Sequence, residues 1–432
     1  MKTQIVLEPL EGQTQCAPLC VLGYCLTRTE FLKPVWERMD CSMKKRDHEP
    51  VEKLQDMLVS ILAGNESVCG INTRIRPDLP LAAAWDRECF AEQSSVARTL
   101  DALGEEHIDQ LRQGSQVLFR RYSRTVKHDF EKEWLLLDID PTHLPVSRHA
   151  PGSRPGYVIG KRNQYGRQWC RISVASYHET LCSLLYPGNQ QGCTMLKPSV
   201  AKVQEFLGLS EQQRQRTILR SDASLGTDAN INWLLWSSYQ VLMKGFSGSR
   251  AVKLAKKVSE QEWFSDRARK RWIAPAPDPP RFARCINMFS LRWQSKTGLR
   301  YGTLLSTLLD LSPLSTLRLH DGRGAVEVEI KADKQGLKAS KRRKKSFAAQ
   351  EALILLTDLA HNLLAWTHHW ILEDGPFESF GTKRMVEELM CIPGQITLKG
   401  NQLQKVALLD KHPFAEDMRL ALLKLLDFFG NP

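Results

Sequence analysis

The sequence lacks the cysteine patterns of a zinc ribbon or of a disulfide-stapled protein. Its cysteines number 11, an odd count, and none of them forms a Cys-x-x-Cys pair. Cys16, Cys20 and Cys25 lie close together in an apolar stretch, where small buried thiols are the better interpretation. We therefore expect free thiols and a reducing, cytoplasmic environment.

Segments that would direct the chain to or through a membrane are also lacking. One lysine, then Glu8 and Glu11, precede the first apolar stretch, which is not the layout of a signal peptide. The most apolar later segment, residues 348–366, is interrupted by acidic and polar side chains and is typical of a buried core helix. The sequence contains neither an internal repeat nor the heptads of a coiled coil. A soluble protein without membrane association is expected.

Acidic residues are too few to balance the basic ones. Lys and Arg total 60 and Asp and Glu total 48, which leaves a formal net charge of +12 at pH 7. Such an excess favours a polyanionic partner, of which nucleic acid is the commonest. A generally basic, soluble surface is the alternative that composition leaves open. At 432 residues the chain is long enough for two or three domains with their own cores.

Helical periodicity dominates residues from about 28 to 125. Val51–Leu62 carries apolar residues at helical spacing, and a second helix is expected to begin near Ser94 and Ser95, a favourable N-cap pair. The second helix has the pattern of a helix-turn-helix, although plain amphipathic helices are the commoner source of such patterns. We expect residues 1–128 to form a helical N-terminal DNA-binding region.

From Trp134 onward, short apolar runs indicate buried strands. Residues 134–140 form one run, ended by Pro141, and residues 171–175 and 217–220 form two more. Residues 198–208 indicate a helix between them. Alternating strands and helices predict an α/β core, whose first part we assign to residues 129–248.

Prolines interrupt the α/β pattern between residues 249 and 318. The stretches 282–293 and 299–309 resemble strands with interleaved aromatic and basic residues, so this segment is expected to be a β-rich insertion. The core resumes over residues 319–432, with a long helix at 348–366, a strand-like piece at 395–398 and a terminal helix at 415–429.

A cluster of charges follows the insertion. Arg323 precedes Glu327 by four positions and Lys334 follows it by seven. If this segment is helical, the three side chains lie on one side of the helix, with a carboxylate between two cations. Neighbouring cations keep a carboxylate ionised, and a metal site needs an ionised carboxylate. Glu327 is therefore a candidate metal ligand.

Two upstream aspartates can complete a metal site with Glu327. Asp138 and Asp140 stand two positions apart on one predicted strand, so both project from the same face, and Asp222 ends another strand. Carboxylates at strand ends are where α/β folds place ligands, and three of them can hold two Mg²⁺ ions for phosphodiester chemistry. The alternatives are that Asp138 caps a turn and that Asp222 is the N-cap of the following helix.

Three blocks of sequence resemble the motif blocks of bacterial DDE transposases of insertion sequences. The blocks are LLLDIDPTHLP (135–145), TILRSDASLG (217–226) and HDGRGAVEVEIKADKQGL (320–337). They are most similar to the cut-and-paste group, which has a β-strand insertion in an RNase-H-like core and the signature Tyr-x-x-Arg-x-x-x-Glu-x-x-x-x-x-x-Lys. Arg323, Glu327 and Lys334 match that signature, whereas His320 stands where the tyrosine is expected. The resemblance spans about residues 130–425 and includes the helix of residues 349–366.

The resemblance implies that Asp140, Asp222 and Glu327 are the catalytic residues and the ligands of two Mg²⁺ ions, with Mn²⁺ able to substitute. Asp140 is preferred over Asp138 because the family's first aspartate closely precedes a threonine, as Asp140 precedes Thr142. A supporting role or a ligand role for Asp138 is left open.

Contacts to DNA follow from the same resemblance. Arg323 and Lys334 would contact phosphates, and His320 would donate a hydrogen bond while its charge varies near neutral pH. Trp293 would stack on a flipped base, with a core position as the alternative. A basic run directly after the catalytic helix favours the DNA backbone. That run comprises Lys341, Arg342, Arg343, Lys344 and Lys345.

Together these features predict a transposase that cuts DNA at the element's ends and joins the freed 3′-hydroxyl to target DNA. Its partners would be terminal inverted repeats and target DNA, with a homodimer holding both ends, in a cytoplasmic, nucleoid-associated setting. Two alternatives remain: a metal-dependent nuclease on the same core, and a non-catalytic DNA-binding derivative of a transposase. The histidine at position 320 and the lack of an aromatic residue after Asp222 favour the latter alternative.

Overall fold

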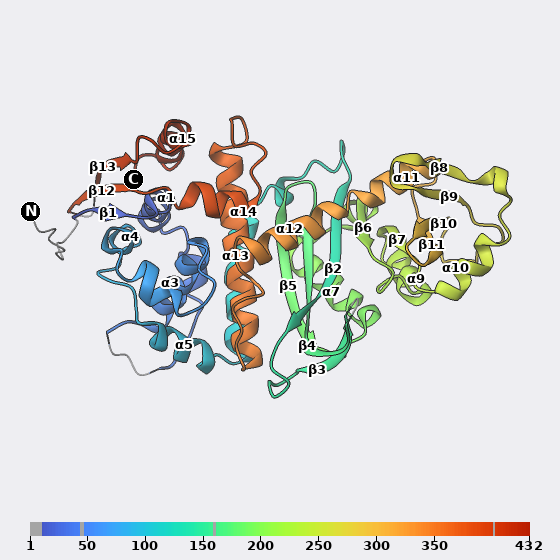
Figure 1. Cartoon of the computed structure of the whole chain (residues 1–432), viewed down its shortest axis with the longest axis horizontal. Coiled ribbons are helices and arrows are strands. Elements are labelled where there is room, and N and C mark those ends of the chain that lie inside the picture. Colours follow the sequence, from blue (N-terminus) through green and yellow to red (C-terminus); the bar gives the residue numbers. More distant parts are fainter. Residues whose placement is uncertain (1–10, 44–46, 159–160, 401) are drawn as a thin grey trace, which may run out of the picture. The chain divides into compact units, whose positions relative to one another are not determined.

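A computed structural model describes residues 11–43, 47–158, 161–400 and 402–432 (Figure 1). The described chain divides into two compact units. Unit 1 comprises the residues up to Leu118 and those from Lys331 onward, and unit 2 comprises Phe119–Ile330. The boundaries fall inside two helices, α6 (Glu105–Tyr122) and α12 (Gly324–Gln335).

Unit 2 is built on a ten-stranded mixed sheet. Its strand order is β3-β4-β2-β6-β7-β11-β10-β9-β8, and β5 pairs with β4 in addition (Figure 1). The first strands are β2 (Leu135–Pro145), β3 (Arg154–Val158), β4 (Lys161–Val174) and β5 (Glu179–Pro187). The parallel strands that follow are β6 (Thr217–Ser221) and β7 (Gln240–Lys244). The remaining four are β8 (Phe264–Asp266), β9 (Arg271–Pro275), β10 (Asn287–Ser295) and β11 (Gly298–Ser306).

Strand direction changes at β2. It runs antiparallel to β4 and parallel to β6, and β6 runs parallel to β7. The crossovers between the parallel strands contain helices, as parallel pairing requires. The helices of unit 2 are α7 (Leu196–Leu207), α8 (Glu211–Gln215), α9 (Asp228–Trp236), α10 (Gly248–Ala255) and α11 (Pro313–Asp321). A buried apolar cluster joins the sheet to α11 through Leu242, Phe289, Leu304 and Leu317.

Unit 1 is mainly helical and holds a three-stranded sheet, β1-β12-β13. The strands are β1 (Gln13–Thr14), β12 (Gly394–Lys399) and β13 (Gln402–Leu408). The helices before unit 2 are α1 (Ala17–Arg28), α2 (Lys33–Trp36), α3 (Pro50–Leu62), α4 (Leu79–Ala84) and α5 (Gln93–Ala102). Those after it are α13 (Phe347–Ile371), α14 (Thr382–Arg384) and α15 (Ala415–Phe428), and short π-helices span Ile71–Ile75 and Met385–Met390. No helix in the described part of the chain is long and apolar enough to cross a membrane.

The predicted helix at Val51–Leu62 is confirmed as α3, which begins with Pro50 and a capping box between Glu49 and Glu52. The predicted burial of the clustered cysteines is also confirmed, since all three lie within or next to α1 in the interior. The predicted cap of α5 is wrong. This helix begins at Gln93, whose backbone N–H donates to Asn72 Oδ1 at 2.8 Å, so a distant side chain satisfies the helix end and not Ser94 or Ser95.

The expected end of the first core strand at Pro141 is also wrong, because β2 continues to Pro145. The pairing explains the continuation. β2 pairs with β6 only as far as Ile139, and beyond that point it pairs with β4 alone, with Pro141 opposite Cys170. One edge of β2 is open there, so the missing N–H group of a proline is tolerated.

Candidate active site

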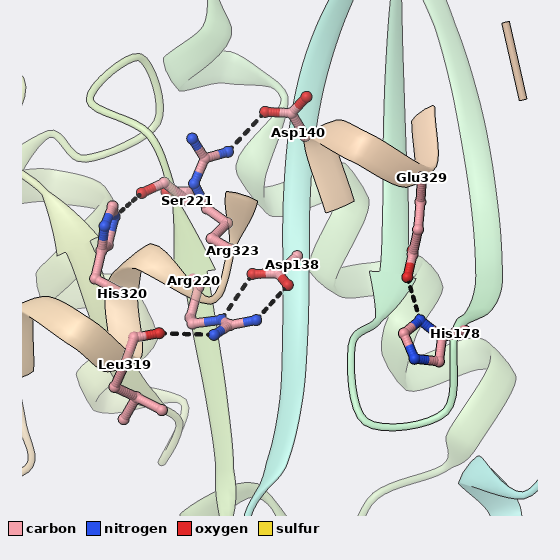
Figure 2. A network of polar contacts seen from close by, with 9 residues as sticks. All are labelled: Asp138, Asp140, His178, Arg220, Ser221, Leu319, His320, Arg323 and Glu329. Atoms are coloured by element: carbon pink, nitrogen blue, oxygen red, sulfur yellow. Dashed lines mark hydrogen bonds and ion pairs between the residues drawn. The ribbon is translucent and has the colours of Figure 1, made fainter. Parts of the chain in front are cut away.

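The candidate site contains a buried ion pair between the neighbouring parallel strands β2 and β6. In the register of β2 with β6, Asp138 is the partner of Arg220. Arg220 donates from Nε and Nη2 to the two carboxylate oxygens of Asp138 at 2.8 and 2.6 Å. Figure 2 shows this pair of contacts. Both side chains are buried, with exposures of 2% for Arg220 and 0% for Asp138. Asp138 therefore does not cap a turn, and both of its oxygens have a partner.

Asp140 and Asp222 follow this pair by two positions on their respective chains. The β2–β6 pairing ends at Ile139 and Ser221, one position before the two aspartates. Because side chains two positions apart on a strand share a face, extending this register by one residue would bring Asp140 next to Asp222 on the face of the Asp138–Arg220 pair. Burial raises the pKa of the Cys170 thiol to about 12, and the charges of Asp140 and Asp222 act on it in the same direction. Both carboxylates thus lie within electrostatic reach of one side chain.

Asp222 stabilises the turn that follows β6. Its Oδ1 accepts hydrogen bonds from the backbone N–H and the hydroxyl of Ser224 at 2.9 and 2.6 Å. The alternative that Asp222 is the N-cap of the following helix is wrong, since α9 begins at Asp228 and Thr227 caps it. A short polar turn directly after β6 therefore presents this carboxylate at the strand's end.

Arg323 pairs with Asp140. Its Nη1 donates to Asp140 Oδ1 at 2.8 Å, and the two side chains are 8% and 16% exposed. The sequence analysis considered one continuous helix carrying Arg323, Glu327 and Lys334, and the structure differs from it. The segment divides into α11, which ends at Asp321, and α12, which begins at Gly324, so Arg323 lies in the turn between them.

The rest of the predicted signature is distributed over α12. Glu327 lies on this helix, but its side chain is outside the described part of the structure. Lys334 lies half-buried in the portion of α12 that belongs to unit 1, whereas Arg323 and Asp140 belong to unit 2. Glu329 contacts His178, a residue of the turn between β4 and β5 (Figure 2). Glu179, the next residue, accepts hydrogen bonds from the segment 123–125 and so has a structural role.

His320 is buried, with 3% of its surface exposed, and its Nε2 donates to Ser221 O at 3.3 Å. Burial lowers the pKa of His320 to about 4, and the positive charge of Lys244 acts in the same direction. The ring is therefore neutral at pH 7. The expectation that its charge varies near neutral pH is wrong, because burial disfavours the charged form.

Arg220 is the functional candidate that sequence reasoning missed. Besides both oxygens of Asp138, it binds Leu319 O through Nη1 at 2.8 Å. The available signal was a lone arginine inside the apolar run Thr217–Ser221, which is buried throughout. A charged residue at such a position needs an opposite charge, and the nearest strand supplies Asp138.

The basic run divides into exposed and buried members. Lys341, Arg343 and Lys345 are exposed, and Lys344 pairs with Asp101 at 2.7 Å. Arg342 is buried, and its guanidinium donates to the backbone carbonyls of Asn65 and Leu337. Burial lowers the pKa of Arg342 to about 9. The structure thus places this arginine inside unit 1 and not on the exposed basic surface.

Trp293 lies at the surface of β10 with 37% exposure, so the alternative of a core position is wrong. A side chain at Gly302 on the neighbouring strand would lie 3.3 Å from its ring, so the glycine makes room for the indole. Trp263 and Trp272 are half-buried and flank the Arg292 guanidinium at 4.4 and 5.1 Å. Trp293 is therefore the more accessible of these three rings.

The donor atoms at Asp140 and Asp222 are carboxylate oxygens, which suit hard divalent cations such as Mg²⁺ and Mn²⁺. Among the described side chains there is no group of three or more acidic, histidine or cysteine residues placed to hold a metal ion.

Residues 32–428 match the family described as "Transposase DDE domain group 1". This match covers most of the chain, and the chain belongs to that family of DDE transposases. DDE transposase domains generally depend on divalent metal ions. Among solved structures the chain is similar to the piggyBac transposase in its synaptic complex with hairpin DNA, with a TM-score of 0.49 and 11% identity. The superposition covers 86% of this chain and 79% of that chain. No curated protein sequence matches it.

Proposed function

We propose that the chain is an active transposase of the insertion-sequence type, which cleaves DNA at the element's ends and joins the freed 3′-hydroxyl to target DNA. The observation that carries the proposal is that Asp140 on β2 and Asp222 directly after β6 each follow the register pair Asp138–Arg220 by two positions. Membership in the DDE family supports the reaction class, because that family is one of transposases.

The strand order supports an RNase-H-like core. β5, β4 and β2 are successive antiparallel neighbours, and β6 and β7 follow on the other side of β2 as parallel strands. The catalytic carboxylates of the proposal lie on β2 and directly after β6. The proposed division of the chain has four parts, 1–128, 129–248, 249–318 and 319–432, and the strands β8–β11 lie within the insertion at 249–318.

The first ligand is proposed to be Asp140 and not Asp138. Arg220 occupies both oxygens of Asp138, whose side chain is 0% exposed, whereas the side chain of Asp140 is 16% exposed. A ligand needs an oxygen that a cation can reach, and Asp140 meets that requirement. Asp140, Asp222 and Glu327 would together hold two Mg²⁺ ions.

When bound, two such ions would activate water and stabilise the leaving oxygen of a phosphodiester. The residues of the chain would orient the DNA. Arg323 would move from Asp140 to a phosphate once a cation neutralises that carboxylate, and Lys334 would contact a second phosphate. Neutral His320 would support the loop after β6 through Ser221. Trp293 and the exposed lysines and arginine after α12 would contact bases and backbone respectively.

The proposed partners are terminal inverted repeats and target DNA, bound by a homodimer within the nucleoid. The net positive charge of +12 supports a polyanionic partner. The match of the third motif block to the Tyr-Arg-Glu-Lys signature, with histidine in the first place, supports an insertion-sequence origin.

The test uses the purified full chain and a duplex carrying the terminal inverted repeat that flanks its reading frame. We expect Mg²⁺-dependent nicking that is abolished in Asp140→Asn, Asp222→Asn and Glu327→Gln, while DNA binding and thermal stability are largely retained. Asp310→Asn, which changes an exposed carboxylate of unit 2, serves as the matched control and should nick normally. Undiminished nicking by Asp140→Asn would overturn the assignment.

A strand-transfer assay separates the proposal from its rivals. A transposase joins the cleaved end to a target plasmid, whereas a nuclease yields cleaved ends only. Wild-type protein that binds the repeat but neither nicks nor joins in Mg²⁺ or Mn²⁺ would indicate a non-catalytic derivative.

A further inference from the structure

Arg220 is the buried point at which three segments of the candidate active site meet. Its Nε and Nη2 bind Asp138 on β2, and its Nη1 donates to the carbonyl of Leu319 near the end of α11 at 2.8 Å. Arg220 itself lies on β6. One guanidinium group therefore joins two strands and a helix, and Figure 2 shows these contacts converging on it.

The first consequence concerns the carboxylates at the strand ends. A one-residue slip between β2 and β6 would turn the side chains of one strand to the opposite face. The pairing of Asp138 with Arg220 is bidentate, so it holds one register and one separation of the two strands. Asp140 and Asp222 each follow this pair by two positions, so the pair also determines how those carboxylates face each other.

The second consequence concerns Arg323. The bond to Leu319 O holds the last turn of α11, and Gly322 follows immediately. A Cβ atom at Gly322 would lie 3.0 Å from Arg220 Nη1, so the guanidinium occupies the space that a side chain would need. The next residue is Arg323, which binds Asp140. Arg220 thus sets the position of the turn from which Arg323 reaches the site.

Fold stability alone does not account for such a pair. Removing two charges from water is costly, and apolar residues of similar size often stabilise a core as well or better than a buried ion pair. The particular contribution of Arg220 and Asp138 is to fix the relative orientation of β2 and β6, because a bidentate pair specifies an orientation that apolar side chains do not.

We propose that Arg220 and Asp138 are positioning residues of the active site, which align Asp140, Asp222 and Arg323 without touching the reacting phosphate. This inference rests on the proposed function. It assigns a role to the first aspartate of the Asp-x-Asp sequence and to the arginine two positions before Asp222.

The main test replaces both partners at once, because removing one would leave the other buried without its counter-charge. In the full chain, Asp138→Val with Arg220→Met supplies a β-branched residue for the strand and an apolar chain in place of the guanidinium. We expect a melting temperature within a few degrees of wild type and unchanged affinity for the terminal repeat. The single-turnover nicking rate should fall by about 100-fold, because a misplacement of catalytic groups by about 1 Å can lower a rate by that factor.

A second readout does not depend on catalysis. Binding of Mn²⁺ to the DNA-free protein, followed by electron paramagnetic resonance, should weaken by about 10- to 100-fold in the double variant, as for the loss of groups that orient metal ligands. A folded double variant with wild-type nicking and wild-type Mn²⁺ affinity would overturn the positioning role. Arg220→Lys keeps the charge without the bidentate geometry and should fall between wild type and the double variant.

A matched pair of glycine variants tests the same role without altering a charge. Gly322→Ala places a methyl group against Arg220 Nη1, whereas a Cβ at Gly324 in the same turn meets nothing within 4 Å. We expect Gly322→Ala to lower nicking by about 10-fold or more and Gly324→Ala to remain near wild type. Equal nicking activities of the two glycine variants would contradict the inference. This test remains valid even if the Asp138→Val/Arg220→Met variant fails to fold.

The two proposals fail in different ways. Nicking by Asp140→Asn at the wild-type rate would remove the proposed function. An inactive Asp140→Asn together with a fully active Asp138→Val/Arg220→Met variant would remove only the positioning role.

Discussion

Arg323 donates from Nη1 to Asp140 Oδ1 at 2.8 Å, and the two residues are 183 positions apart in the sequence. The guanidinium supplies the positive charge that a partly buried carboxylate needs when no metal ion is bound. A cation that binds Asp140 would therefore compete with the guanidinium of Arg323. Under the proposed function, a DNA phosphate would then become the partner of Arg323.

The Arg323→Ala variant tests this competition. Without divalent metal, its free energy of unfolding should fall by about 1–3 kcal/mol, because a charge-assisted hydrogen bond to a mostly buried carboxylate is lost. Added Mn²⁺ should raise its melting temperature more than that of wild type. The exposed Arg318→Ala on α11 is the matched control for thermal unfolding with and without Mn²⁺. A smaller Mn²⁺ effect in Arg323→Ala than in wild type would contradict the competition.

His320 should make stability depend on pH. Its pKa is about 4 in the folded chain and about 6.5 when unfolded, so the unfolded state binds the proton first as the pH falls. The stability present above pH 6.5 is then lost progressively down to pH 4, by about 3 kcal/mol in total. Urea unfolding at several pH values should show this slope reduced in His320→Gln, whose amide can still donate to Ser221. The exposed His149→Gln should retain the slope.

Arg342 should matter for stability and not for DNA binding. Arg342→Ala removes a buried guanidinium and leaves the carbonyls of Asn65 and Leu337 without their donor. We expect a loss of about 2–4 kcal/mol in the free energy of unfolding, measured by urea denaturation. The salt dependence of DNA affinity should not change. A stable variant with weakened DNA binding would place Arg342 at the interface after all.

The exposed neighbours of Arg342 should behave in the opposite way. Lys341→Ala and Arg343→Ala should leave the melting temperature unchanged, because both side chains are exposed. Each should reduce the slope of the logarithm of DNA affinity against the logarithm of salt concentration by about 1, as expected for one lost phosphate contact. Fluorescence anisotropy titrations at several salt concentrations would measure it. Unchanged slopes would show that the basic run does not contact DNA.

Trp293 offers a test of base stacking. Trp293→Ala should weaken binding to a terminal-repeat duplex that carries an unpaired base by about 1–3 kcal/mol, with a smaller effect on fully paired DNA. Trp236→Ala is the control, since that ring is 74% exposed in the same unit and has no proposed contact with DNA. Equal losses for both variants, or for both duplexes, would argue against stacking by Trp293.

Local patterns in the sequence were sufficient to locate many elements. The periodicity of residues 51–62 and 348–366 predicted α3 and most of α13, and the apolar runs predicted β2 and β6, since burial of one face imposes a repeat on nearby residues. Boundaries were less certain. Pro141 predicted the end of β2 and Ser94 the N-cap of α5. Pairing with β4 extends the strand beyond Pro141, and Asn72 accepts the hydrogen bond at the start of the helix.

The sequence by itself determined that carboxylates stand at the ends of two short apolar runs and that Arg323 and Glu327 lie close together in the chain. Only the tertiary structure decided what each charge does. Asp138 and Arg220 lie 82 positions apart and become a buried pair because parallel β2 and β6 align there, which leaves Asp140 as the accessible carboxylate. His320 is neutral and Arg342 is buried for the same reason: the protonation and accessibility of a side chain depend on which distant segments exclude water from it, and no local pattern records those segments.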